Sequence, residues 1–332
     1  MLSRGCQLCL EGAKLVLFVT GLCGFHCPYC PLSSGRWQKD VIFANERPIH
    51  KDSDLIEEAI LTDATGTGIT GGDPLVNIER SLHYAGILKE QFSDHHIHLY
   101  TASPLSHEIL ELMEGLIDEL RIHLIDFSDM SSVQKALDHD FQVGVEIPMI
   151  PSQIEETAAL ISRLEPLGIH FININELEYA DRNRVYLKQC GYEFDSNSCA
   201  VLGSEEAALQ VAKDHEIVHY CSSSDKDAKQ LRNRLIRRAR HVKAPYEDIE
   251  DGLLVTGVIF CENHREATTM KETILQHICM PDNFIRVVGT RVETHWTLIE
   301  EIVQWGETSM GIEKRYPTYN GPLIEYIPIQ KG

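Results

Sequence analysis

Three closely spaced cysteines are the residues best suited to chemistry in this sequence. Cys23, Cys27 and Cys30 form a Cys-x3-Cys-x2-Cys pattern that follows the apolar run at residues 15–19. Thiolates bind soft metal centres such as iron–sulfur clusters, zinc and Cu(I). Because the loop supplies three thiolates and no fourth, it fits a cubane iron–sulfur cluster in which one iron keeps an open coordination position.

Two other interpretations of these cysteines stay open. A structural zinc ion takes four ligands, and His26 is a candidate fourth, although it lies between two of the cysteines rather than on a separate knuckle. The chain would then be a zinc-stabilised binding module without redox chemistry. Alternatively, the cysteines are buried and bind nothing. A disulfide is disfavoured because residues 1–6 carry no export signal, which predicts a cytoplasmic protein.

Composition limits the classes of function. The 332 residues are 43% hydrophobic and 24% charged, which is enough for a well-buried core in one large domain and a smaller one. No apolar run is long enough to span a bilayer, so no membrane partner is expected. The net charge of −20 disfavours a broad nucleic-acid-binding surface. Ten cysteines in a reducing compartment indicate metal or redox work rather than disulfides.

The order of the predicted elements indicates an α/β fold. Strand-like and helix-like segments alternate about every 25 residues, which is typical of right-handed βα crossovers around a parallel sheet. Either a doubly wound sheet or an open, partial barrel fits this pattern, and both place reactive residues at the C-terminal ends of the strands. The six expected strands are a short one before Gly71 and the segments 14–20, 97–102, 120–125, 142–148 and 169–174.

A second motif, Gly71-Gly72-Asp73-Pro74, follows the second of these strands. Glycines let a backbone approach a ligand closely. An ammonium group is bound well by backbone carbonyl oxygens and a carboxylate. Such a string on its own is more often an ordinary turn. Its position one βα unit after the cysteine loop makes the two motifs informative as a pair.

Together, the glycine motif and the cysteine loop, which has Tyr29 before its last cysteine, resemble those of the radical S-adenosylmethionine (SAM) enzymes. The resemblance covers residues 14–180 and implies a partial (βα)6 barrel. It implies that Cys23, Cys27 and Cys30 hold a [4Fe-4S] cluster whose open iron is chelated by SAM. Reductive cleavage of SAM would give a 5′-deoxyadenosyl radical that abstracts hydrogen from an unidentified substrate.

The same resemblance implies further cofactor-binding residues. The glycine motif corresponds to a Gly-Gly-Glu-Pro motif that receives the amino group of SAM, with Asp73 in place of Glu. Gly71 and Gly72 would supply the backbone contacts. By strand order, the positions that contact the ribose, adenine or carboxylate of SAM correspond to Glu146, Asn173 and Asn175.

Not every polar side chain at a strand end is expected to belong to the site. Asp and Asn commonly cap the helix that follows, and we assign about half of these positions to capping alone. His98 and His123 lie within strands. They are expected to line the interior rather than to act as ligands.

A fuller pattern narrows the resemblance. Gly5-Cys6-x2-Cys9 before the first strand and Asn-Glu-Leu-Glu at residues 175–178 look like an archaeal-type uncharacterised family related to pyruvate formate-lyase activating enzyme. The functions that this implies are activation of a glycyl-radical enzyme, peptide modification and RNA-base modification. A reductant such as ferredoxin or flavodoxin is implied as the electron donor.

The remaining cysteines suggest an accessory metal. Cys6 and Cys9 form a Cys-x2-Cys pair, which is half of a zinc site or of a second iron–sulfur cluster. Cys221 is the preferred third ligand because it follows a short predicted strand, and Cys190 and Cys199 are weaker candidates. The alternative is a free, reduced pair.

Outside the core, residues 1–13 are predicted to be an N-terminal extension and residues 181–249 a connecting helical segment. Residues 250–332 are predicted to form a small α+β cap domain over the barrel opening. The basic helix at 226–241 is expected to be a solvated helix face, as charge runs usually are. The alternative is an anion-binding surface for a phosphate-bearing substrate, an acidic partner or RNA, although the helix lacks aromatic residues for base stacking.

Overall fold

The structure, a computed structural model, describes residues 2–196, 198–305 and 308–330. The chain divides into two compact units, Met1–Ile60 with Ala64–Leu231 and Leu61–Asp63 with Arg232–Gly332. This division corrects the predicted boundaries. Residues 1–13 and 181–231 belong to the first unit because a helix and a strand within them pack on its sheet, and the second unit begins at Arg232 rather than at residue 250.

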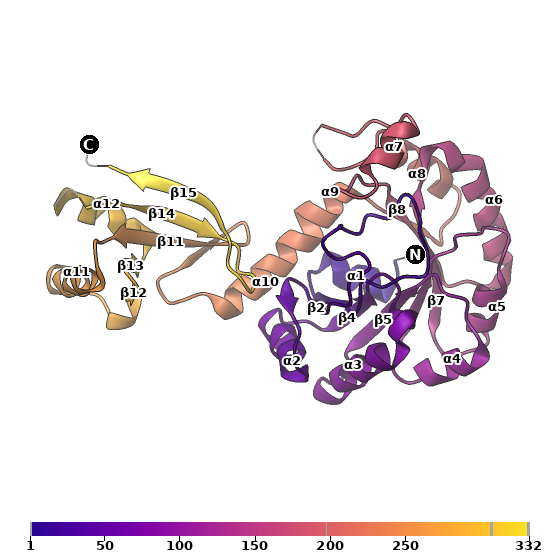
Figure 1. The fold of residues 1–332 in the computed structure, drawn as a ribbon, viewed down its shortest axis with the longest axis horizontal. Coiled ribbons are helices and arrows are strands. Elements are labelled where there is room, and N and C mark those ends of the chain that lie inside the picture. The colour runs from indigo at the N-terminus through magenta and orange to yellow at the C-terminus, as the bar shows by residue number, and fades with distance from the viewer. Residues whose placement is uncertain (1, 197, 306–307, 331–332) are drawn as a thin grey trace. The chain divides into compact units, whose positions relative to one another are not determined.

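The first unit is built on a nine-stranded sheet in the order β3-β2-β1-β4-β5-β6-β7-β8-β9 (Figure 1). The strands from β1 to β9 in this order are parallel, and β2 and β3 add a short antiparallel edge. The bounds are β1 (Lys14–Phe18), β2 (Phe43–Ala44), β3 (Arg47–Pro48), β4 (Gly66–Thr70), β5 (His96–Thr101), β6 (Glu119–Ile122), β7 (Gln142–Met149), β8 (Phe171–Glu176) and β9 (Val218–Cys221).

The predicted α/β fold with a partial barrel is confirmed. All six predicted strands are present, and β9 adds a seventh parallel strand beside β8. The sheet is curved, because a single cavity touches side chains from β1 and from β4 through to β9. The barrel is open, since β1 and β9 are not neighbours in the sheet order of the described residues.

Helices cover the outer face of the curved sheet (Figure 1). Their apolar stripes join the sheet in one hydrophobic cluster, to which α6, for example, contributes Leu160, Ile161 and Leu164. The bounds are α2 (Asp52–Leu61), α3 (Ile78–Gln91), α4 (His107–Met113), α5 (Ser131–Leu137), α6 (Ile154–Leu164), α7 (Arg184–Gln189), α8 (Ser204–Ala212) and α9 (Ser223–Asp225). No helix among the described residues has the length and apolar character needed to cross a membrane.

The inner face of the barrel is unusually polar. Barrels of βα units generally fill their interior with branched apolar side chains. Here the strand register places Arg121 beside Gly144, and Glu146 beside Asn173. Gly144 has no room for a side chain, because a Cβ atom there would collide with the ring of Phe171. Charged groups with small neighbours leave cavities in the interior rather than a packed core.

The second unit is an α+β fold, as predicted. Helix α10 (Arg232–Val242) leads into an antiparallel sheet in the order β12-β13-β11-β14-β15, with β10 paired to β11. The other elements are β10 (Asp248–Glu250), β11 (Leu253–Phe260), α11 (His264–His277), β12 (Ile285–Val288), β13 (Arg291–Thr294), α12 (Ile299–Ile302), β14 (Met310–Arg315) and β15 (Leu323–Ile329). The prediction that this unit covers the barrel mouth stays a prediction.

The sequence patterns missed β13, β14 and α11. The two strands lack the usual apolar alternation because Glu293 and Glu313 occupy buried positions. Arg291 forms ion pairs with both carboxylates, at 3.3 Å to Glu313. Paired charges therefore replace apolar side chains at positions that a hydrophobicity pattern would mark as surface.

The crowding at Gly144 gives a stability test. Gly144→Ala should lower the free energy of unfolding by about 1–3 kcal/mol, because the added methyl group displaces the Phe171 ring. Gly86→Ala in α3 is the control, since nothing lies within 4 Å of a Cβ atom there, and it should raise stability by about 0.5–1 kcal/mol. Urea denaturation followed by circular dichroism measures both variants, and equal effects would contradict the packing described.

Candidate active site

A cavity of about 300 Å³ lies at the C-terminal ends of the parallel strands. Cys23, Cys27 and Cys30 line it, together with Gly71 and Gly72. The two sequence motifs therefore meet at one place, as predicted. We call this space the upper cavity, and its lining also includes Tyr29, Trp37, Tyr100, Arg121, His123, Glu146, Asn175 and Arg182.

The three sulfur atoms fit a cluster better than a single ion. Among the described His, Cys, Asp and Glu side chains, one set of three has ligand atoms that all lie within 4.8 Å of one another. It consists of His96, His98 and Glu119. The ligand atoms of Cys23, Cys27, Cys30 and His26 include no three that meet this 4.8 Å limit. Sulfur atoms around one zinc, each about 2.3 Å from it, lie only about 4 Å apart. A cluster binds each thiolate through a different iron and tolerates wider spacing, so three thiols outside this limit are compatible with a cluster.

Burial affects the protonation of the loop thiols. Partial burial raises the pKa values of Cys23 and Cys27 above the ordinary thiol value. Among the remaining influences, the backbone N–H of Phe25, 3.4 Å from the Cys23 sulfur, favours the thiolate of that residue. Free Cys23 and Cys27 therefore keep their protons at neutral pH, and loading a metal must release them.

A second loop, at residues 31–40, supports the cysteine loop through hydrogen bonds. Gly21 donates its N–H to the carbonyl of Lys39 at 2.8 Å, and a Cβ atom on Gly21 would collide with the carbonyl of Arg36. The side chain of Gln38 donates to the carbonyl of Cys23 at 2.7 Å. The segment between the cysteines and β2 is therefore ordered support for the loop.

The glycine pair is required by backbone packing. The N–H of Gly72 donates to the carbonyl of Thr20 at 2.7 Å. A Cβ atom on Gly71 would collide with that same carbonyl, and one on Gly72 would collide with the carbonyl of Leu22. The turn after β4 thus lies directly against the start of the cysteine loop. The backbone of both glycines still faces the upper cavity.

Asp73 has a different role from the predicted one. Its carboxylate does not line the upper cavity and is buried among protein donors. It accepts hydrogen bonds from the Thr101 hydroxyl, the Ala102 N–H and the N–H and hydroxyl of Ser103, at 2.9–3.1 Å. It also accepts from the Leu75 N–H at 2.9 Å, which caps the 3₁₀ turn Pro74–Asn77. The shorter Asp side chain suits this brace between the β4 and β5 loops.

Tyr29 and His123 form part of the cavity wall. The Tyr29 hydroxyl lies 3.0 Å from Nε2 of His123, whose Nδ1 lies 3.0 Å from the backbone carbonyl of Glu146. Burial lowers the pKa of His123, so its imidazole is neutral. Strand position alone did not identify His123 as a site residue, because its contact with the cysteine loop comes from a segment about one hundred residues away in sequence.

Of the three residues predicted to contact SAM, Glu146 and Asn175 line the upper cavity and Asn173 does not. Glu146 accepts from Arg121 at 2.6 Å and from the Asn175 amide at 2.8 Å. Burial opposes ionisation of Glu146, but the Arg121 guanidinium outweighs it and holds the pKa below the usual value. Asn173 faces a second, deeper cavity, since residues two apart on a strand lie about 6.6 Å apart along the barrel.

Arg182 is a site residue that the sequence patterns missed. Its guanidinium stacks on Trp37 at 3.9 Å from the ring centroid and lines the upper cavity. Its buried Nη1 atom has no hydrogen-bond partner within the described residues. The neighbouring Asn183 ties this segment to the cysteine loop by donating to the carbonyl of Tyr29 at 3.0 Å. A buried donor without a partner next to a cavity is suited to an anionic ligand.

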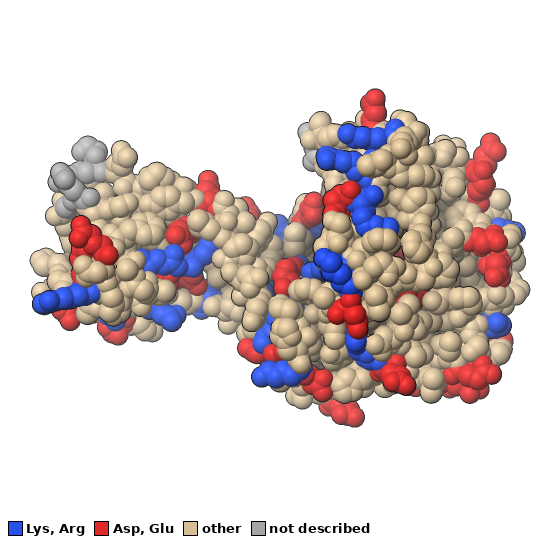
Figure 2. Space-filling view, viewed as in Figure 1, with Lys and Arg blue, Asp and Glu red and all other residues tan. Residues whose placement is uncertain are grey.

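The basic segment is mostly paired with acids. Within each unit its cations meet carboxylates at short range: Lys226 with Glu178 at 2.6 Å, Lys229 with Asp225 at 2.7 Å, and Arg232 with Asp251 at 2.9 Å. On the face that Figure 2 shows, basic and acidic residues are interspersed. The pairing agrees with the solvated-helix interpretation and gives no support to an RNA-binding surface.

The brace at Asp73 can be tested against a ligand role. Asp73→Asn should destabilise the protein by about 2–3 kcal/mol, because the amide turns a donor toward groups that themselves donate. Asp126→Asn is the matched control at another strand end, where the exposed carboxylate accepts from the Ser128 N–H, and a much smaller loss of stability is expected. Thermal unfolding measures both. A stable Asp73→Asn variant with weakened SAM binding would contradict the structural role.

Comparison with known proteins agrees with the geometry. Residues 17–164 match the family model described as the radical SAM superfamily, and residues 252–329 match a domain of unknown function, DUF8061. A protein of Methanocaldococcus jannaschii, described provisionally as a glycyl-radical enzyme activating enzyme, is 37% identical over 356 aligned positions that cover 99% of this chain and 93% of that protein.

Two solved structures show partial likeness. Streptococcus suis SuiB bound to S-adenosylmethionine is 10% identical, with 63% of this chain and 50% of that chain covered and a TM-score of 0.43. The structure described as anSMEcpe with bound AdoMet is 10% identical, with 48% of each chain covered and a TM-score of 0.34. At these scores neither likeness bears on identity. The near full-length relative at 37% identity does show the family. The chain is a radical SAM enzyme of the family related to pyruvate formate-lyase activating enzyme.

Proposed function

We propose that this enzyme cleaves SAM reductively at a [4Fe-4S] cluster held by Cys23, Cys27 and Cys30. The resulting 5′-deoxyadenosyl radical would abstract hydrogen from a glycine residue of a partner enzyme. The observation that carries the proposal is the convergence of the three thiols and the glycine turn on one cavity at the C-terminal end of the barrel. The radical SAM family membership of the chain supports the same chemistry.

The proposed reaction consumes one electron for each SAM molecule. Cys23, Cys27 and Cys30 would hold the cluster, which would supply the electron that breaks a carbon–sulfur bond of SAM to give methionine and a carbon radical. The substrate loses one hydrogen atom, and 5′-deoxyadenosine gains it. The electron comes from a low-potential reductant such as ferredoxin or flavodoxin.

The backbone of Gly71 and Gly72 would receive the amino group of SAM. Both residues line the upper cavity beside the cysteine loop. A chain without side chains at these positions lets carbonyl oxygens approach an ammonium group closely. Asp73 would act through the backbone it braces rather than by touching SAM.

Arg182 would bind the carboxylate of SAM. Its guanidinium is held against Trp37 and offers a buried N–H group that has no protein partner within the described residues. Arginine binds carboxylates through charge-assisted hydrogen bonds. Glu146 and Asn175, already bonded to each other, would present the remaining polar wall to the nucleoside.

The other walls of the upper cavity would protect the radical. Apolar groups line it from the cysteine loop and from the ends of β7 and β8: Phe25, Leu32, Ile147, Pro148 and Leu177. A carbon radical reacts with stray hydrogen donors, so a cavity that excludes water favours transfer to the intended substrate. A protein substrate would have to present its reacting residue to this opening.

Activation of a glycyl-radical enzyme is favoured over the other functions in this class. The near full-length relative carries that description. RNA modification would need exposed cations, and the basic segment instead pairs its charges with carboxylates. The partner of the present chain is therefore proposed to be a protein with a backbone glycine accessible in an extended segment.

Reconstituted wild-type protein, incubated anaerobically with reductant and SAM, should release 5′-deoxyadenosine. The variant Cys23→Ala/Cys27→Ala/Cys30→Ala should release none above background, because it lacks the ligands of the cluster. Cys190→Ala/Cys199→Ala is the control with exposed cysteines outside the upper cavity, and it should retain wild-type release. Liquid chromatography quantifies the nucleoside. A wild-type protein that holds zinc without iron and releases no nucleoside would instead favour a zinc-stabilised binding module.

Arg182→Gln should weaken SAM binding by about tenfold to a hundredfold, since a charge-assisted hydrogen bond is worth about 1.5–3 kcal/mol. Arg184→Gln is the control, because Arg184 is exposed and does not line the upper cavity. Anaerobic calorimetry on the reconstituted proteins gives both dissociation constants. Equal affinities for the two variants would remove Arg182 from the proposed SAM site.

A further inference from the structure

A second cavity of about 350 Å³ lies deeper in the barrel. Cys6, Cys9 and Cys221 all line it, as does His219. Cys6 and Cys9 come from helix α1 (Arg4–Leu10), whereas His219 and Cys221 come from β9, more than two hundred residues later. We call this space the lower cavity. The fold therefore gathers three cysteines from the two ends of the first unit around one space.

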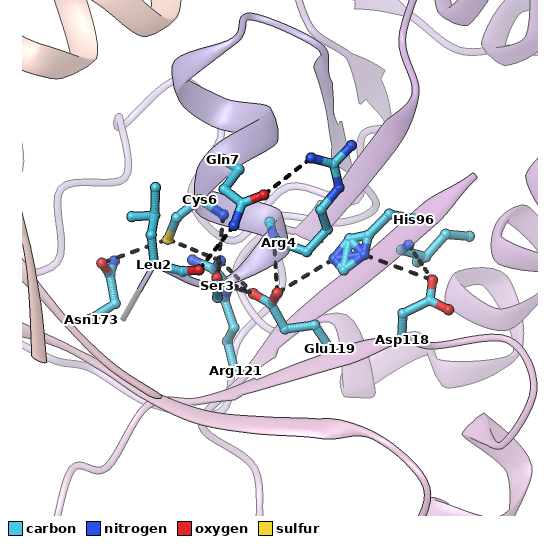
Figure 3. A network of polar contacts seen from close by, with 12 residues as sticks. Leu2, Ser3, Arg4, Cys6, Gln7, His96, Asp118, Glu119, Arg121 and Asn173 are labelled. Atoms are coloured by element: carbon cyan, nitrogen blue, oxygen red, sulfur yellow. Dashed lines mark hydrogen bonds and ion pairs between the residues drawn. The ribbon is translucent and has the colours of Figure 1, made fainter. Parts of the chain in front are cut away.

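Helix α1 is fixed to the barrel by a buried polar network. The Ser3 side chain caps the helix and lies 3.1 Å from Oε1 of Glu119, and the Gly5 N–H donates to Oε2 of Glu119 at 3.0 Å. Figure 3 shows these contacts and the Cys6 sulfur between Arg121 and Asn173. Cys6 and Cys9 are three residues apart, so they lie on one side of the helix. The network thus holds the Cys-x2-Cys pair toward the interior.

The group formed by His96, His98 and Glu119 belongs to this anchor. Although their ligand atoms lie within 4.8 Å of one another, the Glu119 carboxylate is already bonded to the Gly5 N–H and forms an ion pair with Arg121. A cation there would face the guanidinium at close range. We therefore attribute this histidine–carboxylate group to the attachment of α1 rather than to metal binding.

Each of the three sulfur atoms has a nitrogen donor beside it. The guanidinium of Arg121 donates to the Cys6 sulfur at 3.3 Å, and the amide of Gln230 donates to the Cys221 sulfur at 3.4 Å. The Lys14 ammonium neighbours the Cys9 side chain. Donors aimed at cysteine sulfur are a feature of iron–sulfur sites, where they adjust the reduction potential.

The lower cavity also carries the positive charge of Lys14, which interacts with the Glu146 carboxylate without forming an ion pair. Lys14 is partly buried, and no carboxylate within the described residues lies at ion-pair distance from it. Its neighbours are the Cys9 side chain and the ring of Tyr100, whose centroid is 6.0 Å away. Placing an ammonium away from water without an ion-pair partner is unfavourable. A thiolate-bound metal centre is anionic and would supply the missing negative charge.

The spacing of the donor atoms disfavours a single metal ion and leaves room for a cluster. Ligand atoms around a single ion are expected to lie within about 4.8 Å of one another, and one set of three described side chains does so. No three of the ligand atoms of Cys6, Cys9, Cys221 and His219 meet this limit. Cys23, Cys27 and Cys30 also fall outside that limit. A centre with several irons, each bound to one thiolate, bridges such gaps where zinc would not.

We propose that Cys6, Cys9 and Cys221 hold a second iron–sulfur cluster inside the barrel, with His219 as the candidate fourth ligand. The wall between it and the SAM site is formed by residues that line both cavities: Tyr100, Arg121, Glu146 and Asn175. The weaker candidates Cys190 and Cys199 line neither cavity.

The test uses protein without the first cluster, so that it does not depend on SAM chemistry. The full chain carrying Cys23→Ala/Cys27→Ala/Cys30→Ala is reconstituted anaerobically with iron and sulfide. It should retain about two to four irons per chain, with the broad visible absorption of an iron–sulfur centre. Adding Cys6→Ser/Cys9→Ser should reduce the iron to background, whereas adding Cys190→Ser/Cys199→Ser should leave it unchanged.

Circular dichroism and gel filtration confirm that each variant is folded. Should the alanine variant fail to fold, the comparison is made with the cysteine loop intact, where Cys6→Ser/Cys9→Ser should lower the iron content by the same amount. Folded protein that binds no iron at the lower cavity overturns the proposal. Stoichiometric zinc in place of iron, removed by Cys6→Ser/Cys9→Ser, also overturns it.

Discussion

The backbone of the glycine turn approaches the cysteine loop so closely that neither Gly71 nor Gly72 can carry a side chain. This contact fixes two loops that follow neighbouring parallel strands, β1 and β4. Hydrogen bonds from Gly72 to Thr20 and from Asp73 to Leu22 hold it at 2.7 and 2.9 Å. This contact therefore fixes the position of the three thiols relative to the proposed binding site for the amino group of SAM. Every other part of the upper cavity is arranged around that contact.

Deeper in the barrel, Arg121 fixes the neighbouring groups in position, as the contact between the glycine turn and the cysteine loop does above it. Its guanidinium is fully buried and forms ion pairs with Glu119 and Glu146, while also contacting Tyr100 and Cys6. A buried charge is tolerated when its partners are complete, and removal of one partner is costly. Arg121 thus links helix α1, which carries the accessory cysteines, to the polar wall of the SAM site. One cation connects both cavities.

The sequence predicted the parts of the site that depend on short-range spacing. The cysteine loop, the glycine pair and the six strands all follow from residues close together in the chain. The role of Asp73 did not, because its partners Thr101 to Ser103 lie on another loop. Arg182 was not predicted because the sequence around it has no hydrophobic periodicity or motif that indicates a site residue. Of the two asparagines of β8, Asn175 lines both cavities and Asn173 only the lower one, a distinction that strand order cannot make.

The central claim is that SAM binds directly to a cluster held by Cys23, Cys27 and Cys30. The most direct measurement is the electron paramagnetic resonance spectrum of the reduced cluster during titration with SAM. The variant Cys6→Ser/Cys9→Ser is used so that only the first cluster contributes. A spectrum that shifts and saturates at one SAM molecule per cluster is the predicted result. A spectrum that SAM leaves unchanged, in folded protein with a full complement of iron, would contradict the account.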